Sequence, residues 1–179
     1  MTEKSRTVGL ILLTDHPRKG RVAVLQRRGS YNPETDEDVT WKYGCQATSH
    51  GIIPASVHTP VDALLGHVQA QLGYVLLQHV SLHLEDLICL MENEETPREI
   101  VTTYGMLLPN WKIFNRGIKL HPGTGGLEWI NESRLAIVAA LTHKNKNKGA
   151  GRCNIAMFPD EKEALTKAFQ IFAGLAVTQ

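Results

Sequence analysis

The sequence has little cysteine and no long apolar run. Its three cysteines, Cys45, Cys89 and Cys153, are far apart and show no paired spacing, which argues against a disulfide framework and a zinc knuckle. They are interpreted as free thiols in a reducing compartment. The longest apolar run near the N-terminus, residues 8–13, is too short to span a bilayer or to form the core of a signal peptide. We therefore expect a cytoplasmic protein that makes no membrane contact.

An excess of charge of either sign is also missing. The 19 Lys and Arg residues and the 18 Asp and Glu residues leave a net charge of +1, so no global field attracts nucleic acid, and nucleic-acid binding is not expected. Lys and Arg are absent from residues 43–97, a stretch that holds five of the eight histidines. The hydrophobic fraction of 42% is that of an ordinary globular protein. The length predicts one domain, residues 1–179.

The pattern of apolar and turn-forming residues predicts alternating strands and helices. Residues 8–14 form a continuous apolar run, typical of a strand buried on both faces, and residues 21–27 predict its antiparallel neighbour. Later strands are predicted at residues 41–53, 80–90, 100–108 and 125–130. An acidic turn is predicted at residues 92–97, a helix from Asn131 or Ser133 toward Leu141, and a last helix at residues 159–172.

The clearest helix is predicted at residues 59–72. Thr59 or Ser56 can cap it, Pro60 fits its first turn, and Gly73 fits its C-terminal cap. Apolar residues recur along it at three- and four-residue steps and form one stripe. The members of this stripe are Val61, Leu64, Leu65, Val68 and Leu72.

This helix and the loop before it resemble the signature of the Nudix family. The family signature has Gly, five residues, Glu, seven residues, Arg-Glu, an apolar residue, any residue, Glu-Glu, any residue and Gly. Counted back from Gly73, the family's Glu, Arg, Glu, Glu and Glu positions hold His58, Gly66, His67, Ala70 and Gln71. Gly51 lies seven residues before His58, one more than the strict spacing. Further family segments are resembled by residues 22–28, by Trp41 with residues 45–51, by residues 129–132 and by residues 159–165. The resemblance implies an α/β/α sandwich around a mixed β-sheet.

The same resemblance implies a chemistry for which this chain lacks the residues. Nudix enzymes cleave a diphosphate joined to another group, often in a nucleoside diphosphate derivative, with Mg²⁺ or Mn²⁺ held by the box glutamates. Asp62 is the only carboxylate between His58 and Leu84, and it does not match a family ligand position. We therefore predict a pseudoenzyme without ordinary Mg²⁺-dependent diphosphate hydrolysis, and no catalytic residue is assigned.

Four residues are the candidates for contact with a ligand. His67 and Gln71 are four apart and share one helix edge, which is interpreted either as the lining of a residual cleft or as a plain polar edge. Arg27 and Arg28 are the candidates for phosphate, and in a strand only one of them can point inward.

A metal site of a different kind is a further hypothesis. His50, His58 and His67 would suit Zn²⁺, Ni²⁺ or Co²⁺ if the loop brought them together, whereas their spacing matches no known zinc motif and also fits scattered histidines.

Three functions remain open on the sequence. The preferred one is binding of a nucleotide-like or phosphorylated ligand in the residual cleft. The alternatives are an active hydrolase that uses replacement metal ligands for Mg²⁺ or Mn²⁺, and a protein-interaction module without a small ligand. A homodimer is compatible with the family resemblance.

Overall fold

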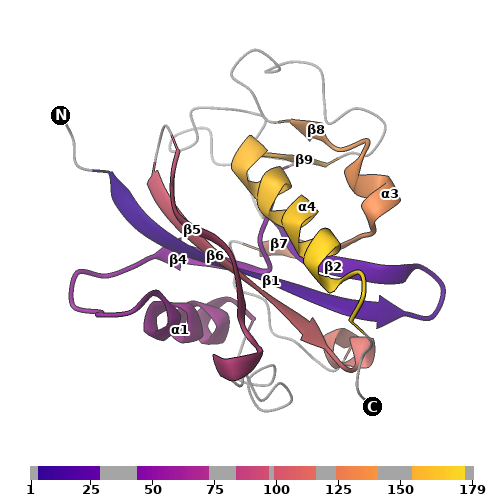
Figure 1. The fold of residues 1–179 in the computed structure, drawn as a ribbon, viewed down its shortest axis with the longest axis horizontal. Helices are drawn as coiled ribbons and strands as arrows, with labels where there is room; N and C mark the ends of the chain where they lie inside the picture. Colours follow the sequence, from indigo (N-terminus) through magenta and orange to yellow (C-terminus); the bar gives the residue numbers. More distant parts are fainter. Residues whose placement is uncertain are drawn as a thin grey trace.

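A mixed sheet of seven strands forms the centre of the molecule (Figure 1). The fold is that of a computed structural model, which describes residues 4–28, 44–72, 84–96, 99–115, 124–140 and 155–175. The strands of this sheet are β1 (Ser5–His16), β2 (Gly20–Arg28), β3 (Cys45–Gln46), β4 (Ser49–Ile52), β5 (Ile88–Glu95), β6 (Glu99–Leu108) and β7 (Thr124–Ile130). Two further strands, β8 (Ala139–Ala140) and β9 (Ala156–Met157), pair in parallel.

Strand β1 is the central strand of the sheet. It runs parallel to β6 on one side. On its other side it pairs antiparallel with β4 through its first half and with β2 through its second half. Eight consecutive residues of β1, from Thr7 to Thr14, are buried. The predicted strand buried on both faces and its antiparallel neighbour are therefore confirmed, and Gly20 makes the turn between them at φ +69.

Helices cover both faces of the sheet. The helical segments are α1 (Pro60–Leu72), η2 (Leu84–Asp86), η3 (Trp111–Asn115), α3 (Glu132–Leu135) and α4 (Pro159–Phe172). Helix α1 lies on one side of the sheet, and α3 and α4 lie on the other (Figure 1). The predicted α/β/α sandwich around a mixed sheet is thus confirmed. No helix among the described residues is long and apolar enough to cross a membrane.

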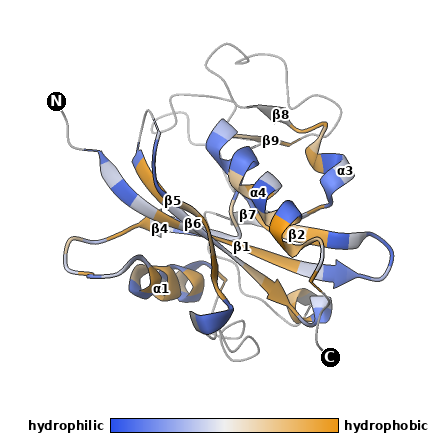
Figure 2. Cartoon of the chain, in the orientation of Figure 1, coloured by the Kyte–Doolittle hydropathy of each residue, from blue (hydrophilic) through white to orange (hydrophobic). Residues whose placement is uncertain are grey.

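Each face of the sheet has its own hydrophobic core. Alternate residues of β1 point to opposite faces, so Leu10 and Leu12 pack with α1 while Ile11 and Leu13 pack with α4. Close packing on the α4 side needs a glycine, because a Cβ at Gly105 would lie 2.9 Å from Phe172. Figure 2 shows apolar residues concentrated along the strands between the helices. Because of this alternation, residues on opposite faces of the sheet cannot share one site.

Two predicted elements are wrong in their extent. Strand β5 begins at Ile88 and continues to Glu95, so most of the predicted acidic turn belongs to a strand. In the described part of the sheet β5 lies at an edge, where exposed acidic side chains stay in solvent. Its pairing with β6 has register shifts, and Asn93 adopts φ 49, which interrupts the alternation that a sequence pattern would reveal.

Helix α3 is also shorter than predicted. Asn131 caps it as expected, since its Oδ1 accepts a hydrogen bond from Arg134 N at 2.9 Å. The helix ends at Leu135 instead of continuing toward Leu141. A few residues later, Ala139 and Ala140 pair with Ala156 and Met157 of β9. A tertiary contact therefore ends this helix, and no local stop signal is required.

Candidate functional site

Helix α1 begins where the sequence predicts. The Thr59 hydroxyl accepts a hydrogen bond from Asp62 N at 3.2 Å and bonds to the Asp62 carboxylate at 2.7 Å, so Thr59 rather than Ser56 is the N-terminal cap. Pro60 occupies the first helical position, where a missing N–H costs nothing. The predicted cap at Gly73 lies outside the described residues. The start of α1 is therefore as predicted, and no glutamate lies within the helix.

Both the oxygen and the nitrogen of the Gln71 side-chain amide form hydrogen bonds to the sheet. Its Oε1 accepts hydrogen bonds from Gln26 Nε2 at 2.7 Å, from Ser49 Oγ at 3.1 Å and from His50 N at 3.1 Å. Its Nε2 donates to the His50 carbonyl at 2.5 Å. Gln71 therefore bonds to the backbone of β4 much as a neighbouring strand would, and it fastens α1 to the sheet.

Gln26 is a residue of this site that the sequence reasoning missed. It is only 4% exposed, and besides Gln71 its Nε2 donates to Thr48 O at 2.6 Å. The Thr48 hydroxyl in turn accepts from Leu12 N at 2.8 Å and donates to Val24 O. A buried polar layer therefore lies between α1 and the strands. Its signal in the sequence was a lone amide directly after an apolar strand segment, because a buried amide requires partners.

The ring of His67 lies against the backbone of β4. A Cβ built on Gly51 would be 2.3 Å from Cε1 of the His67 ring and 2.4 Å from both ring nitrogens, so only glycine leaves room for this contact. The Nε2 atom of His67 lies 2.8 Å from Ile52 O, where a ring N–H donates to the carbonyl. His67 and Gln71 therefore lie together on one edge of α1, as predicted, and both are hydrogen-bonded to β4.

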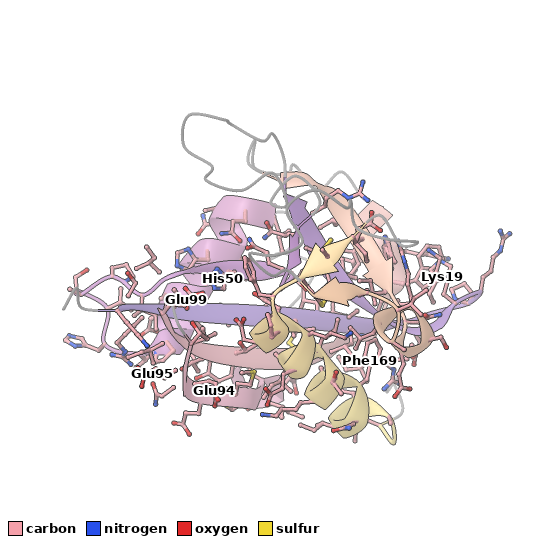
Figure 3. All side chains as sticks on the ribbon, turned by 90° about the horizontal axis from the view of Figure 1, so that it is seen from above. Lys19, His50, Glu94, Glu95, Glu99 and Phe169 are labelled. Atoms are coloured by element: carbon pink, nitrogen blue, oxygen red, sulfur yellow. The ribbon has the colours of Figure 1, made fainter. Side chains whose placement is uncertain are left out.

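The three candidate metal histidines do not converge. Because His67 covers the α1 face of Gly51, the preceding side chain, His50, points to the opposite face of the sheet. On that face His50 Nε2 lies 3.8 Å from Oε1 of Glu99, and Figure 3 shows these two residues next to each other. His58 is exposed in the loop before α1. A shared ion for these three residues is excluded by this geometry.

Arg27 also lies on the face away from α1. Gln26 points toward α1, so its neighbour Arg27 points toward the α3 and α4 side, as Leu25 does. Arg28 is the last residue of β2, and its side chain lies outside the described part of the chain. Arg27 is thus separated by the sheet from His67 and Gln71, with which the sequence grouped it.

Arg27 belongs to a network of three charged side chains. Its guanidinium lies 2.7 Å from Oε1 of Glu128, and Arg134 lies 3.3 Å from the other oxygen of the same carboxylate. Two guanidinium groups share one carboxylate, so these three side chains together carry a net positive charge. The buried Nε of Arg27 has no hydrogen-bond partner among the described residues. Nearby, burial raises the pKa of the Cys45 thiol to about 12, with a further contribution from Glu128.

The two tryptophans that the structure describes contact other rings. The Trp129 ring packs edge-to-face on Phe114 at 5.3 Å, and the Trp111 ring lies 4.7 Å from His16. Trp41 lies outside the described residues, as does the basic segment 142–152.

Comparison with known proteins gives the same architecture. No family model matches the sequence, and no curated protein is similar enough in sequence to match. Solved structures match over nearly the whole chain. The MutT/nudix family protein from Enterococcus faecalis has a TM-score of 0.57 at 14% identity, over 97% of this chain and 63% of that one. The NUDIX domain of Shewanella oneidensis NrtR, complexed with ADP ribose, has a TM-score of 0.59 at 11% identity, over 96% and 90%. The chain has the Nudix fold.

A third solved structure with this fold contains a protein partner. It is the complex between the C-terminal domain of mouse MUTYH and human PCNA, with a TM-score of 0.54 at 12% identity over 99% of this chain and 94% of that one. Identities this low carry the Nudix fold and leave the activity open.

Nudix enzymes hold Mg²⁺ or Mn²⁺ with the glutamates of the signature, and the residues of α1 do not fit such an ion. Gly66 and Ala70 carry no ligand atom, and the ring nitrogen of His67 is bonded to a carbonyl. The oxygen of Gln71 already accepts three hydrogen bonds. Hard cations prefer charged oxygen ligands. Among the described residues, no group of three or more His, Cys, Asp or Glu could hold a metal ion.

Proposed function

We propose that this Nudix-fold chain binds a nucleotide-like or phosphorylated ligand and does not carry out metal-dependent diphosphate hydrolysis. The observation that carries the proposal is the hydrogen bonding of Gln71. Its amide uses one oxygen and one NH₂ group to bond four partners in the sheet. At this position the Nudix signature has a glutamate that helps to hold the metal ion. The neutral amide of Gln71 instead bonds α1 to the sheet, so this edge of α1 stabilises the fold.

The anion-binding part of the proposal rests on Arg27 and Arg134. Both guanidinium groups contact the same carboxylate, that of Glu128, and Arg134 also donates to Trp129 O at 3.3 Å. The exposed fractions of the Arg27 and Arg134 side chains are 37% and 35%, so both are open to a ligand from solvent. Arginine forks suit phosphate oxygens because two parallel N–H groups can bond one phosphate. The structurally similar NUDIX domain of Shewanella oneidensis NrtR was solved with ADP ribose, which is a ligand of this class.

A thermal-shift panel with ADP-ribose, ADP, AMP and a sugar phosphate tests the proposal. A ligand present at 100 times its dissociation constant should stabilise the chain by about 2.7 kcal/mol. We expect Arg27→Gln and Arg134→Gln each to weaken binding at least tenfold, because a hydrogen bond to a charged group contributes about 1.5–3 kcal/mol. Arg18→Gln, which removes an exposed arginine in the β1–β2 turn, is the matched control and should bind as the wild type does.

Two outcomes would contradict the proposal. If Mg²⁺, Mn²⁺ or Zn²⁺ causes the chain to release AMP or phosphate from any compound of the panel, the chain is a hydrolase with replacement ligands. If no compound shifts the unfolding temperature, small-ligand binding is wrong and a protein-interaction module, as in the neighbour bound to a protein, takes its place.

A further inference from the structure

The sheet carries a second polar pair on the face away from α1. His50 comes from β4 and Glu99 from the start of β6, with β1 between these two strands. Their side chains nevertheless approach to 3.8 Å between Nε2 and Oε1. This pair was not grouped by the sequence, where the two residues are far apart, and it lies across the sheet from His67.

The distance between His50 Nε2 and Glu99 Oε1 is longer than a hydrogen bond. It is close to the distance between two atoms that bind the same metal ion. An N–H···O bond spans about 2.7–3.2 Å between heavy atoms. Two ligand atoms at about 2.0–2.1 Å from a tetrahedral ion lie roughly 3.4 Å apart. A side-chain shift of about 0.4 Å would therefore bring both atoms into the coordination sphere of one ion.

The burial of the pair also suits a metal site. The side chains of His50 and Glu99 are 19% and 16% exposed, so both are largely held by the protein while one side stays open to water. Such a site supplies two protein ligands and leaves coordination positions for water or for a ligand.

Thr7 provides an independent observation at the same place. It is 2% exposed, and its hydroxyl has no hydrogen-bond partner among the described residues. Ser5, Thr7 and Gly9 share one face of β1. Glu99 is opposite Ser5 and His50 is opposite Gly9, so Thr7 occupies the row between them. A buried hydroxyl without a partner commonly marks a missing water or ion.

We propose that His50 and Glu99 bind a divalent transition-metal ion, and that Thr7 hydrogen-bonds a water molecule on that ion. An imidazole nitrogen with one carboxylate oxygen favours Zn²⁺, Co²⁺ or Ni²⁺ over Mg²⁺, which prefers oxygen ligands. The ion lies on the α4 face of the sheet, opposite the face that α1 covers. A hydroxyl that orients a metal-bound water acts from the second coordination shell.

Isothermal titration with Zn²⁺ alone, at pH 7 in a buffer that does not bind metal, tests this site. We expect His50→Gln and Glu99→Gln each to weaken the Zn²⁺ site at least tenfold and Thr7→Val to weaken it less. His58→Gln is the matched control, because His58 is an exposed histidine of the loop before α1, and it should leave Zn²⁺ affinity unchanged.

A second measurement, by nuclear magnetic resonance, uses the wild-type chain and so does not depend on whether the variants fold. Zn²⁺ should shift the imidazole resonances of His50 at one equivalent, before those of His58 and His67. The proposal is overturned if the His50 resonances do not respond to Zn²⁺. It is equally overturned if a folded His50→Gln chain binds Zn²⁺ as the wild type does, since the ion then lies elsewhere.

Discussion

Replacing Gln71 by the glutamate of the Nudix signature should destabilise this chain. The two side chains have nearly the same shape, so Gln71→Glu puts a second oxygen at the position of Nε2. In the native structure that atom donates to the His50 carbonyl at 2.5 Å. The substitution therefore removes one hydrogen bond and places two oxygens against each other, while the three donors to Oε1 remain.

The size of the effect follows from these contacts. Losing a hydrogen bond of this kind costs about 0.5–1.5 kcal/mol, and an acceptor left without a donor in a partly buried site costs about 1–3 kcal/mol. The remaining donors become stronger because they now bond to a charged oxygen, and they offset part of the loss. We expect a net decrease of about 2–3 kcal/mol in the free energy of unfolding at pH 7.

The loss should depend on pH in a defined direction. A protonated carboxyl can donate to the His50 carbonyl, so folding raises the pKa of the introduced carboxyl above the unfolded value of about 4.3. A raised folded pKa means that the penalty is complete above that pKa and shrinks as the pH falls toward the unfolded value. The variant should therefore approach the stability of the wild type near pH 4.

Urea unfolding monitored by circular dichroism at pH 7 and pH 4.5 measures both effects. Gln69→Glu is the matched control, since Gln69 is an exposed residue of the same helix, and it should change the unfolding free energy by less than about 0.5 kcal/mol. The reasoning is refuted if Gln71→Glu and Gln69→Glu are equally stable at pH 7, or if the difference between them does not decrease on acidification.

Two further predictions concern buried contacts of the same molecule. Gly51→Ala forces a methyl group into the His67 ring and should cost about 1–3 kcal/mol of unfolding free energy; adding His67→Ala should recover most of this loss, and a lack of recovery in the double-mutant cycle would show that the ring is not the obstacle. Burial raises the pKa of the Cys45 thiol to about 12, so the reactive thiolate is scarce in the native state. Cys45 should therefore react with a thiol reagent at pH 8 only after unfolding. Mass spectrometry of the labelled peptides checks this, and rapid native labelling at Cys45 would contradict it.

The sequence was a good guide wherever a local pattern determined the structure. The apolar run of β1 predicted a doubly buried strand, and Thr59 with Pro60 predicted the start of α1. It was a poor guide where a partner decided the outcome. The end of α3 depends on pairing with β9, and the acidic end of β5 is extended because it pairs with β6.

The same division holds for the candidate site. The spacing of four between His67 and Gln71 was enough to place them on one helix edge, and the missing glutamates were read directly from the chain. What these side chains bond to could not be read from spacing. Gln26, the main partner in the buried layer, lies on another strand, and His50 and Glu99 meet across β1.

The sequence by itself therefore determined the doubly buried strand, the start of α1 and the absence of the signature glutamates, because helix periodicity, caps and residue identity are local properties. Only the tertiary structure decided which site residues lie on the same face of the sheet. The alternation of side chains about β2 and β4 separates Arg27 and His50 from the edge of α1 that carries His67 and Gln71. That separation depends on strand register and on which helix covers each face, and both are set by long-range packing.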